Sequence, residues 1–140
     1  MRAYRRDFRT VYRDASPYCM AAVFVVCADT TEDAERLAAS IDLRRLQMAR
    51  GQEDTVATTE EALARSYSEA ERAIIVKERA RAVVGAPEVA RVRLLELKEQ
   101  FEADELMVVT ITGDYASRLR SYELLAETFA LDASHAATEE

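Results

Sequence analysis

The sequence contains few of the residues that most often carry catalysis or metal binding. It has one histidine, two cysteines and three glycines among 140 residues. His135 lies near the C-terminus in a segment without apolar periodicity, which disfavours a Ser-His-Asp or Cys-His nucleophile and leaves no Cys/His cluster for zinc. Gly51, Gly85 and Gly113 lie too far apart to form a GxGxxG motif or a phosphate-binding loop. The sequence therefore leaves the catalytic residues unassigned and predicts no metal site.

The two cysteines are not expected to form a disulfide. Cys19 and Cys27 belong to one apolar run that we interpret as a strand, where about 3.3 Å of rise per residue separates them by roughly 26 Å. A disulfide tolerates only about 6 Å between Cα atoms, so the two cannot pair within that strand. We expect small buried side chains and a reducing, cytoplasmic location.

Basic charge and long apolar runs are also scarce. The net charge of -7 disfavours a nucleic-acid partner, because phosphate binding needs a basic surface. The longest apolar run, residues 17–28, is shorter than the roughly 20 residues of a membrane-spanning helix. The arginine-rich start of the chain carries Tyr4, Phe8 and Tyr12 at helical spacing, with Asp7 interrupting the basic face. This pattern favours an ordinary amphipathic helix over a transit peptide or a membrane-surface helix.

Two apolar segments predict β-strands. Residues 18–27 are apolar on both alternating faces, which is typical of a parallel strand covered on both sides by helices. Residues 106–111 form a second such strand, followed by a turn at Gly113. Because a two-stranded sheet with open edges is marginal in water, we expect these strands to belong to a larger sheet.

Capping signals and apolar stripes predict the helices between and after these strands. Thr30 offers a cap to a helix that ends at Gly51, Ser68 and Glu71 form a capping box, and Asp114 caps the last helix. Residues 52–59 are interpreted as an exposed loop, and the VVGAPE sequence as a helix break with Pro87 in the next first turn. The expected stripes are Ala34, Leu37, Ala38, Ile41 and Leu46, then Ala90, Leu94, Leu97 and Phe101, and finally Leu119, Tyr122, Ala126 and Phe129. The alternation of strands and helices predicts an α/β fold.

Several segments occur in an order and at spacings that are characteristic of one protein family. They are AYRRDF, PYCMAAVFVVCADTTEDAERLA, YSEAERAIIV, ARAVVGAPEVARVRLLELKEQF and ADELMVVTITGDYASRLRSYELLAETF. In this order they resemble the C-terminal part of bacterial luciferase-like, flavin-dependent monooxygenases. The resemblance covers nearly the whole chain apart from its tail.

The resemblance implies a fold that this chain contains only in part. Members of the family are eight-stranded β/α barrels of more than twice this length. The implied fold is a partial β/α (TIM-type) barrel of α/β class, helix-rich, made of the last two strands with their helices. Residues 18–28 would be the seventh strand, residues 106–111 the eighth, and residues 29–82 an excursion that carries a lid. We expect one α/β unit over residues 1–131 and a disordered tail over residues 132–140.

The resemblance also implies where a cofactor would lie. In β/α barrels the site is at the carboxyl ends of the strands, so the candidate cofactor-binding residues are Thr110, Thr112, Gly113 and Asp114. For Asp114 a plain helix cap is the alternative, and for the two threonines it is packing inside the barrel. The implied cofactor is reduced FMN, with a deazaflavin as the alternative.

Two functions remain open from the sequence. The first is the C-terminal segment of a flavin-dependent monooxygenase that oxygenates a small organic substrate and is inactive alone. The second is a non-catalytic α/β remnant that self-associates or binds a barrel partner. We therefore expect a homo-oligomer or a complementary barrel chain as partner, and neither nucleic acid nor membrane.

Overall fold

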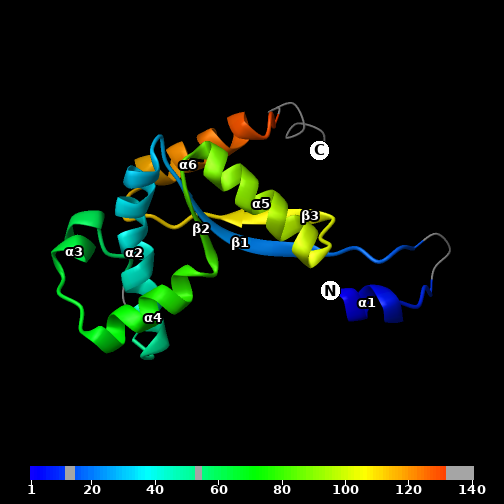
Figure 1. The fold of residues 1–140 in the computed structure, drawn as a ribbon, viewed down its shortest axis with the longest axis horizontal. Coiled ribbons are helices and arrows are strands. Elements are labelled where there is room, and N and C mark those ends of the chain that lie inside the picture. The colour runs from blue at the N-terminus through cyan, green and yellow to red at the C-terminus, as the bar shows by residue number, and fades with distance from the viewer. Residues whose placement is uncertain (12–14, 53–54, 132–140) are drawn as a thin grey trace.

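The computed structural model describes residues 1–11, 15–52 and 55–131. Within these residues the chain forms helices and a single parallel sheet (Figure 1). The elements are α1 (Arg2–Asp7), β1 (Met20–Cys27), α2 (Thr31–Ala49), α3 (Thr59–Ala64), α4 (Glu69–Arg79), β2 (Ala82–Gly85), α5 (Pro87–Phe101), β3 (Glu105–Val109) and α6 (Tyr115–Thr128). The predicted α/β class is confirmed, whereas the predicted tail lies outside the described residues.

The sheet has three strands where the sequence predicted two. Its order is β2-β1-β3, with β1 in the centre and both pairings parallel. The segment interpreted as a helix break is instead the short strand β2. It pairs with the second half of β1, where Phe24 lies opposite Ala82 and Cys27 opposite Gly85. The sequence missed this strand because four apolar residues at the end of a helix carry no distinguishing periodicity.

One face of the sheet is covered by α5 and α6. Alternate side chains of β1 point toward these helices and are almost completely buried. The buried cluster comprises Val23, Val25, Cys27, Val83, Ala90, Leu94, Leu124 and Leu125. Burial of such side chains is the main source of stability, at about 25 cal/mol for each Å² of apolar surface removed from water.

The opposite face is covered only near the carboxyl ends of the strands. There α2 packs Ala38 and Ile41 against Val26 of β1, and α2, α3 and α4 gather as a lobe at this end of the sheet (Figure 1). Nearer the start of β1, the side chains of this face are exposed, with Met20 at 42% and Phe24 at 38%. The prediction that β1 is buried on both sides is therefore wrong for its first half.

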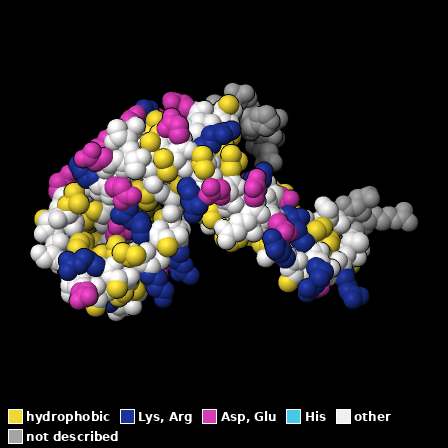
Figure 2. Space-filling model, viewed as in Figure 1, with side chains coloured by type: hydrophobic (Ala, Val, Ile, Leu, Met, Phe, Trp, Pro, Cys, Tyr) yellow, Lys and Arg dark blue, Asp and Glu magenta, His cyan; other side chains and the backbone are white. Residues whose placement is uncertain are grey.

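We define the open sheet face as Met20, Ala22, Phe24 and Met107. The first three alternate along β1, and Met107 of β3 lies opposite Ala22 in the parallel register and is 49% exposed. In Figure 2 the molecule is hollowed between the lobe of α2, α3 and α4 and the N-terminal helix. The Arg45 guanidinium lies 4.8 Å over the Phe24 ring, but Met20 and Met107 remain exposed. Exposed apolar patches of this kind often mark a surface that contacts something else.

Most predicted helix starts are confirmed. The hydroxyl of Thr30 accepts the N–H of Asp33 at the start of α2, and Ser68 with Glu71 forms a complete capping box on α4. Pro87 occupies the first turn of α5. The helix α3 was not predicted, because its capping residues Thr58 and Glu61 lie in a polar stretch without an apolar stripe.

The predicted buried face of α6 is right for Phe129, which packs against the buried cluster, but wrong for Leu119. Leu119 is 45% exposed, whereas Ser121, Leu124 and Leu125 are buried. The hydroxyl of Ser121 accepts the N–H of Cys27 at 3.0 Å, so a polar residue at the centre of this face satisfies the backbone at the end of β1. This contact and the burial of Leu124 and Leu125 turn that face of α6 toward the sheet. The apolar spacing alone did not predict this orientation.

The N-terminal helix is shorter than expected, and one of its arginines is not solvated. The rings of Tyr4 and Phe8 lie 5.6 Å apart in an edge-to-face contact, as their helical spacing predicted, while Tyr12 lies outside the described residues. The Arg5 guanidinium donates to the Glu102 carbonyl at 2.8 Å and pairs with Asp104 at 2.5 Å. These bonds tie α1 to the turn between α5 and β3.

Both cysteines are buried and free, as predicted. Burial raises the pKa of the Cys27 thiol to about 11, which keeps it protonated and unreactive near neutral pH. Among the described residues no helix is long and apolar enough to cross a membrane.

Candidate functional site

The carboxyl ends of β1 and β3 open into two adjoining cavities of about 250 and 300 Å³. We call the first the α3-side cavity, because Thr58, Thr59 and Glu60 line it together with the start of α6. The second lies between the starts of α2 and α6. Arg36, Leu37 and Ser117 border both, so the two form one cleft at the end of the sheet where parallel α/β folds usually bind ligands.

The structure brings only part of the predicted site to this cleft. Gly113 and Asp114 line the α3-side cavity, whereas Thr110 is 1% exposed and its hydroxyl has no partner among the described residues. The Thr112 hydroxyl donates to the Asp114 carbonyl at 2.7 Å. The alternative of interior packing therefore describes the position of Thr110 better than ligand contact does.

Asp114 caps α6, which was the alternative predicted for it. Its carboxylate accepts the N–H of Ser117 at 2.8 Å, and this bond with the backbone holds the pKa of Asp114 below its usual value. A carboxylate that is engaged in this way is a poor proton acceptor near neutral pH. Asp114 is therefore a structural element of the cleft.

Gly113 allows the segment before α3 to approach β3 closely. A Cβ atom at this position would lie 2.8 Å from the Ala57 carbonyl oxygen, the Thr58 Cα and the Ser40 hydroxyl. Backbone atoms cannot yield as a flexible side chain can, so any larger residue would push residues 57–58 away. The absence of a side chain at Gly113 thus fixes the wall of the α3-side cavity.

In the second cavity the two charged side chains that face each other are paired. The Arg120 guanidinium lies 2.5 Å from the Asp29 carboxylate, and this hydrogen bond holds the pKa of Asp29 below its usual value. The pair joins α6 to the segment that leads from β1 into α2. It closes one side of the cleft rather than offering a free charge.

The sequence missed Arg36, Thr59 and Ser117 as residues of the cleft. Each comes from a different helix, and none belongs to a motif that marks a binding site. The only local signal was the polar stretch around Thr59, which reads as the solvated start of a helix. Their proximity follows from tertiary packing. Helix α2 packs on the sheet, and Gly113 lets the segment before α3 come close to the end of β3.

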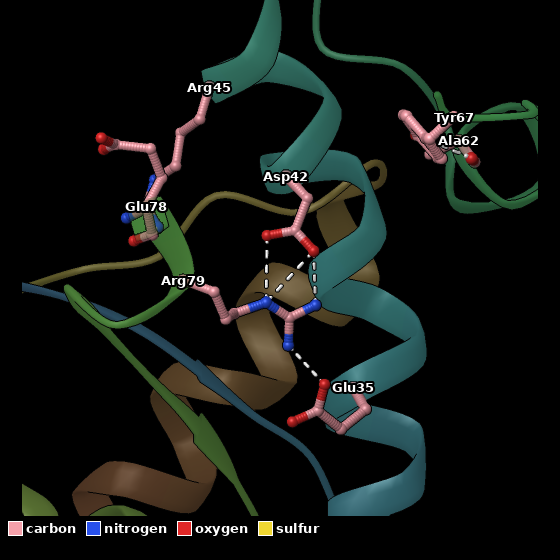
Figure 3. Close-up of polar contacts among 7 residues, drawn as sticks. All are labelled: Glu35, Asp42, Arg45, Ala62, Tyr67, Glu78 and Arg79. Carbon is pink, nitrogen blue, oxygen red and sulfur yellow. Dashed lines mark hydrogen bonds and ion pairs between the residues drawn. The ribbon is translucent and has the colours of Figure 1, made fainter. Parts of the chain in front are cut away.

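The lobe over the cleft is fastened by buried ion pairs. The guanidinium of Arg79 on α4 donates to both oxygens of Asp42 on α2, at 3.0 and 3.1 Å from Nε, and also pairs with Glu35 (Figure 3). Asp42 is only 6% exposed. One helical turn away, the Arg45 side chain donates to the Glu78 carbonyl at 2.9 Å. We call Asp42, Arg79 and Glu35 the α2–α4 clamp.

A second carboxylate fastens the same lobe. Glu71 accepts the N–H of Ser68 at 2.7 Å and pairs with Arg50 at 2.8 Å and Arg65 at 3.1 Å. The backbone bond from Ser68, aided by the two arginines and opposed by burial, lowers the pKa of Glu71 to about 2 from its usual 4.5. The folded state therefore favours the charged carboxylate.

This pKa shift predicts that the contribution of Glu71 to stability is lost in acid. A pKa lowered by folding stabilises the protein fully above the unfolded pKa, and the contribution falls as the pH drops from there toward about 2. Wild type and Glu71→Gln should differ in free energy of unfolding by a constant amount above about pH 5, with a narrowing gap below it. Urea titrations between pH 6 and pH 2 measure this gap. A gap that stays constant down to pH 2 would contradict the assignment.

The chain is similar to part of several longer proteins. The chain is 38% identical over 128 residues to YceB and 40% identical over 131 residues to YwcH, both of Bacillus subtilis (strain 168). It is 27% identical over 121 residues to a luciferase-like monooxygenase of Escherichia coli (strain K12). The crystal structure of apo-MsnO8 matches 94% of the chain with a TM-score of 0.80 and 31% identity. No family model matches the sequence.

The chain resembles a luciferase-like protein in sequence. It spans 39% of the length of YceB and of YwcH, 36% of the Escherichia coli monooxygenase and 40% of the apo-MsnO8 chain. These matches support the family resemblance that the sequence segments predicted. They do not by themselves show a partial barrel, and the described sheet is the three-stranded arrangement given above.

Neither cavity of the cleft on its own is large enough for a whole flavin. The two cavities of about 250 and 300 Å³ lie at or below the lower end for small-molecule sites, which is about 300 Å³. Their walls mix small apolar side chains and Leu37 with the charged Arg36 and the hydroxyl of Ser117. Among the described residues no group of three or more His, Cys, Asp or Glu could hold a metal ion.

Proposed function

We propose that this chain supplies the C-terminal part of a luciferase-like, flavin-dependent oxidoreductase. The observation that carries the proposal is the similarity of most of the chain to about two fifths of longer proteins, one of them a luciferase-like monooxygenase. The open sheet face supports it, because Met20, Phe24 and Met107 are apolar, aligned and exposed where more of a sheet or barrel could pack. The isolated chain is then expected to be inactive.

The proposed reaction belongs to the assembled protein. A bound reduced flavin would supply the two electrons with which dioxygen oxygenates a small organic substrate, one oxygen atom going into the substrate and the other into water. FMN is the proposed flavin, and a deazaflavin is the alternative. The residues of this chain are assigned no chemical step in this proposal.

Under this proposal the chain has two structural roles. Its strands β1 and β3 continue a sheet whose other strands come from a complementary β/α segment. Its lobe of α2, α3 and α4, fastened by the α2–α4 clamp, covers the carboxyl ends of those strands, where water must be excluded from a reduced flavin. The complementary segment packs against the open sheet face.

A chimera tests the proposal. The matched segment of YwcH, at 40% identity, is replaced by this chain, and binding of reduced FMN is measured under anaerobic conditions for YwcH and the chimera. We expect both to bind, with dissociation constants within about tenfold of each other, or about 1.4 kcal/mol. A chimera that melts cooperatively but binds no flavin, beside a YwcH that does, contradicts the proposal. A YwcH that binds no flavin contradicts the flavin assignment itself.

The open sheet face also favours a second candidate, a non-catalytic module that associates with itself. Stacking two copies through Met20, Phe24 and Met107 would cover the apolar surface without any complementary segment. The chimera separates the two candidates. The first candidate requires that the chimera fold with the remaining part of YwcH. The second predicts that two copies of the isolated chain cover each other's open sheet face.

A further inference from the structure

The α3-side cavity holds polar groups that the fold leaves without partners. Thr59 is 4% exposed, lines the cavity, and its hydroxyl has no partner among the described residues. The hydroxyl of Ser40 is fully buried beside Gly113 and is likewise without a partner there. A buried hydroxyl without a hydrogen bond costs about 1 to 3 kcal/mol. Of these two groups, Thr59 belongs to the cavity wall and Ser40 lies next to the lining residue Gly113.

Arg36 supplies a positive charge to the same cavity. Its side chain is 54% exposed, and among the described residues its ion pair is a loose contact of 4.0 Å with Asp33. A guanidinium held so weakly can turn its donors to a ligand at little cost. Ser117, in the first turn of α6, adds a half-buried hydroxyl to the wall.

Two of the carboxylates near the cavity are engaged with the backbone. Asp114 accepts the N–H of Ser117 at 2.8 Å. Glu61 accepts the N–H of Thr58 at 2.9 Å, and the bond lowers the pKa of Glu61. Glu60 is exposed at the cavity wall. Arg36 and the hydroxyls are the uncommitted hydrogen-bond donors, and they match an oxyanion, which accepts hydrogen bonds on every side.

We propose that the α3-side cavity binds a tetrahedral oxyanion, such as phosphate or the phosphate or sulfonate group of a small molecule, through Arg36, Thr59 and Ser117. A volume of about 250 Å³ holds such a group but not a flavin ring. The overall charge of -7 repels anions from the surface at large, so binding depends on this local arrangement. The site is formed within this chain and does not depend on the proposed flavin chemistry.

Titration of the 140-residue chain with inorganic phosphate, at constant ionic strength, tests the site. We expect saturable shifts of the Thr59, Gly113 and Ser117 amide signals in NMR spectra. Arg36→Gln should weaken binding at least about tenfold, a loss of about 1.4 kcal/mol. The matched control is Arg91→Gln, which removes the same charge from the exposed side of α5 and should leave binding unchanged.

A second variant separates hydroxyl chemistry from charge. Thr59→Val keeps the shape of a buried side chain but removes the hydroxyl, and should weaken phosphate binding while a thermal melt confirms the fold. Shifts that fail to saturate overturn the proposal. Equal weakening by Arg36→Gln and Arg91→Gln overturns it too, because binding would then follow net charge alone.

The source of the oxyanion is distinguished by competition. If FMN displaces phosphate and riboflavin does not, the oxyanion belongs to the cofactor; if FMN binds elsewhere or not at all while phosphate saturates, it belongs to a substrate or is free phosphate. Both outcomes retain the site. Failure of the YwcH chimera to bind flavin leaves phosphate binding by this chain unaffected, so the two proposals fail separately.

Discussion

Replacing Asp42 with asparagine is expected to lower the free energy of unfolding by about 3 kcal/mol, because removing one partner of a buried ion pair is strongly destabilising and leaves the Arg79 guanidinium with the exposed Glu35 as its remaining carboxylate partner. Asp42 is 6% exposed and holds Arg79 through bonds at 3.0 and 3.1 Å. The Arg79 side chain is only 25% exposed, so water cannot replace the lost carboxylate fully. Urea titration at pH 7 measures the difference.

The α2–α4 clamp provides its own control. Glu35 pairs with the same guanidinium (Figure 3) but is 54% exposed, so Glu35→Gln should cost no more than about 1 kcal/mol, as surface pairs do. The two variants remove the same charge from the same arginine and differ in burial. If they destabilise the chain equally, burial is not what makes the clamp strong, and the lobe of α2, α3 and α4 is held by its apolar contacts instead.

The helix starts could be predicted because they depend on neighbours within the sequence. Thr30, Ser68 and Asp114 each accept an N–H from the third residue that follows, and such bonds form whatever the rest of the chain does. The strand β2 could not be predicted in this way. Its four residues become a strand only because the second half of β1, far away in the sequence, offers them a pairing edge.

The sequence predicted the location of the candidate site but not all of the residues that line it. The sequence located it after the last strand, and Gly113 and Asp114 do line the cavity there. Arg36 and Thr59 come from α2 and α3, whose approach depends on contacts such as that of Gly113 with residues 57–58. The uncommitted hydroxyls cannot be recognised without coordinates, because only packing determines which polar groups lack a partner.

The open sheet face explains why the interpretation of β1 was partly wrong. Its sequence is apolar on both faces, as in a strand that is covered twice, but the described residues cover the first half of β1 only from the side of α5 and α6. The sequence of β1 is thus consistent with a larger sheet than the three strands provide. When no complementary segment is present, a second copy of the chain can cover the open sheet face.

The isolated chain is therefore expected to self-associate through this face, and Met107→Lys should weaken the association at least about tenfold. Met107 is 49% exposed beside Ala22, and a lysine there would have to lose its hydration in the interface. In a two-fold dimer both copies carry the substitution, so its cost counts twice. Sedimentation velocity over a range of concentrations measures the effect.

Val92→Lys is the matched control, because Val92 is 54% exposed on α5, on the other side of the sheet, and the same change in charge should leave association unaltered. A wild-type chain that stays monomeric at every concentration would sink the prediction, as would equal weakening by both variants. In the first case the monomer leaves Met20, Phe24 and Met107 exposed to water without associating. The strongest structural reason for a complementary segment then disappears. In the second, association is governed by net charge and the face has no special role.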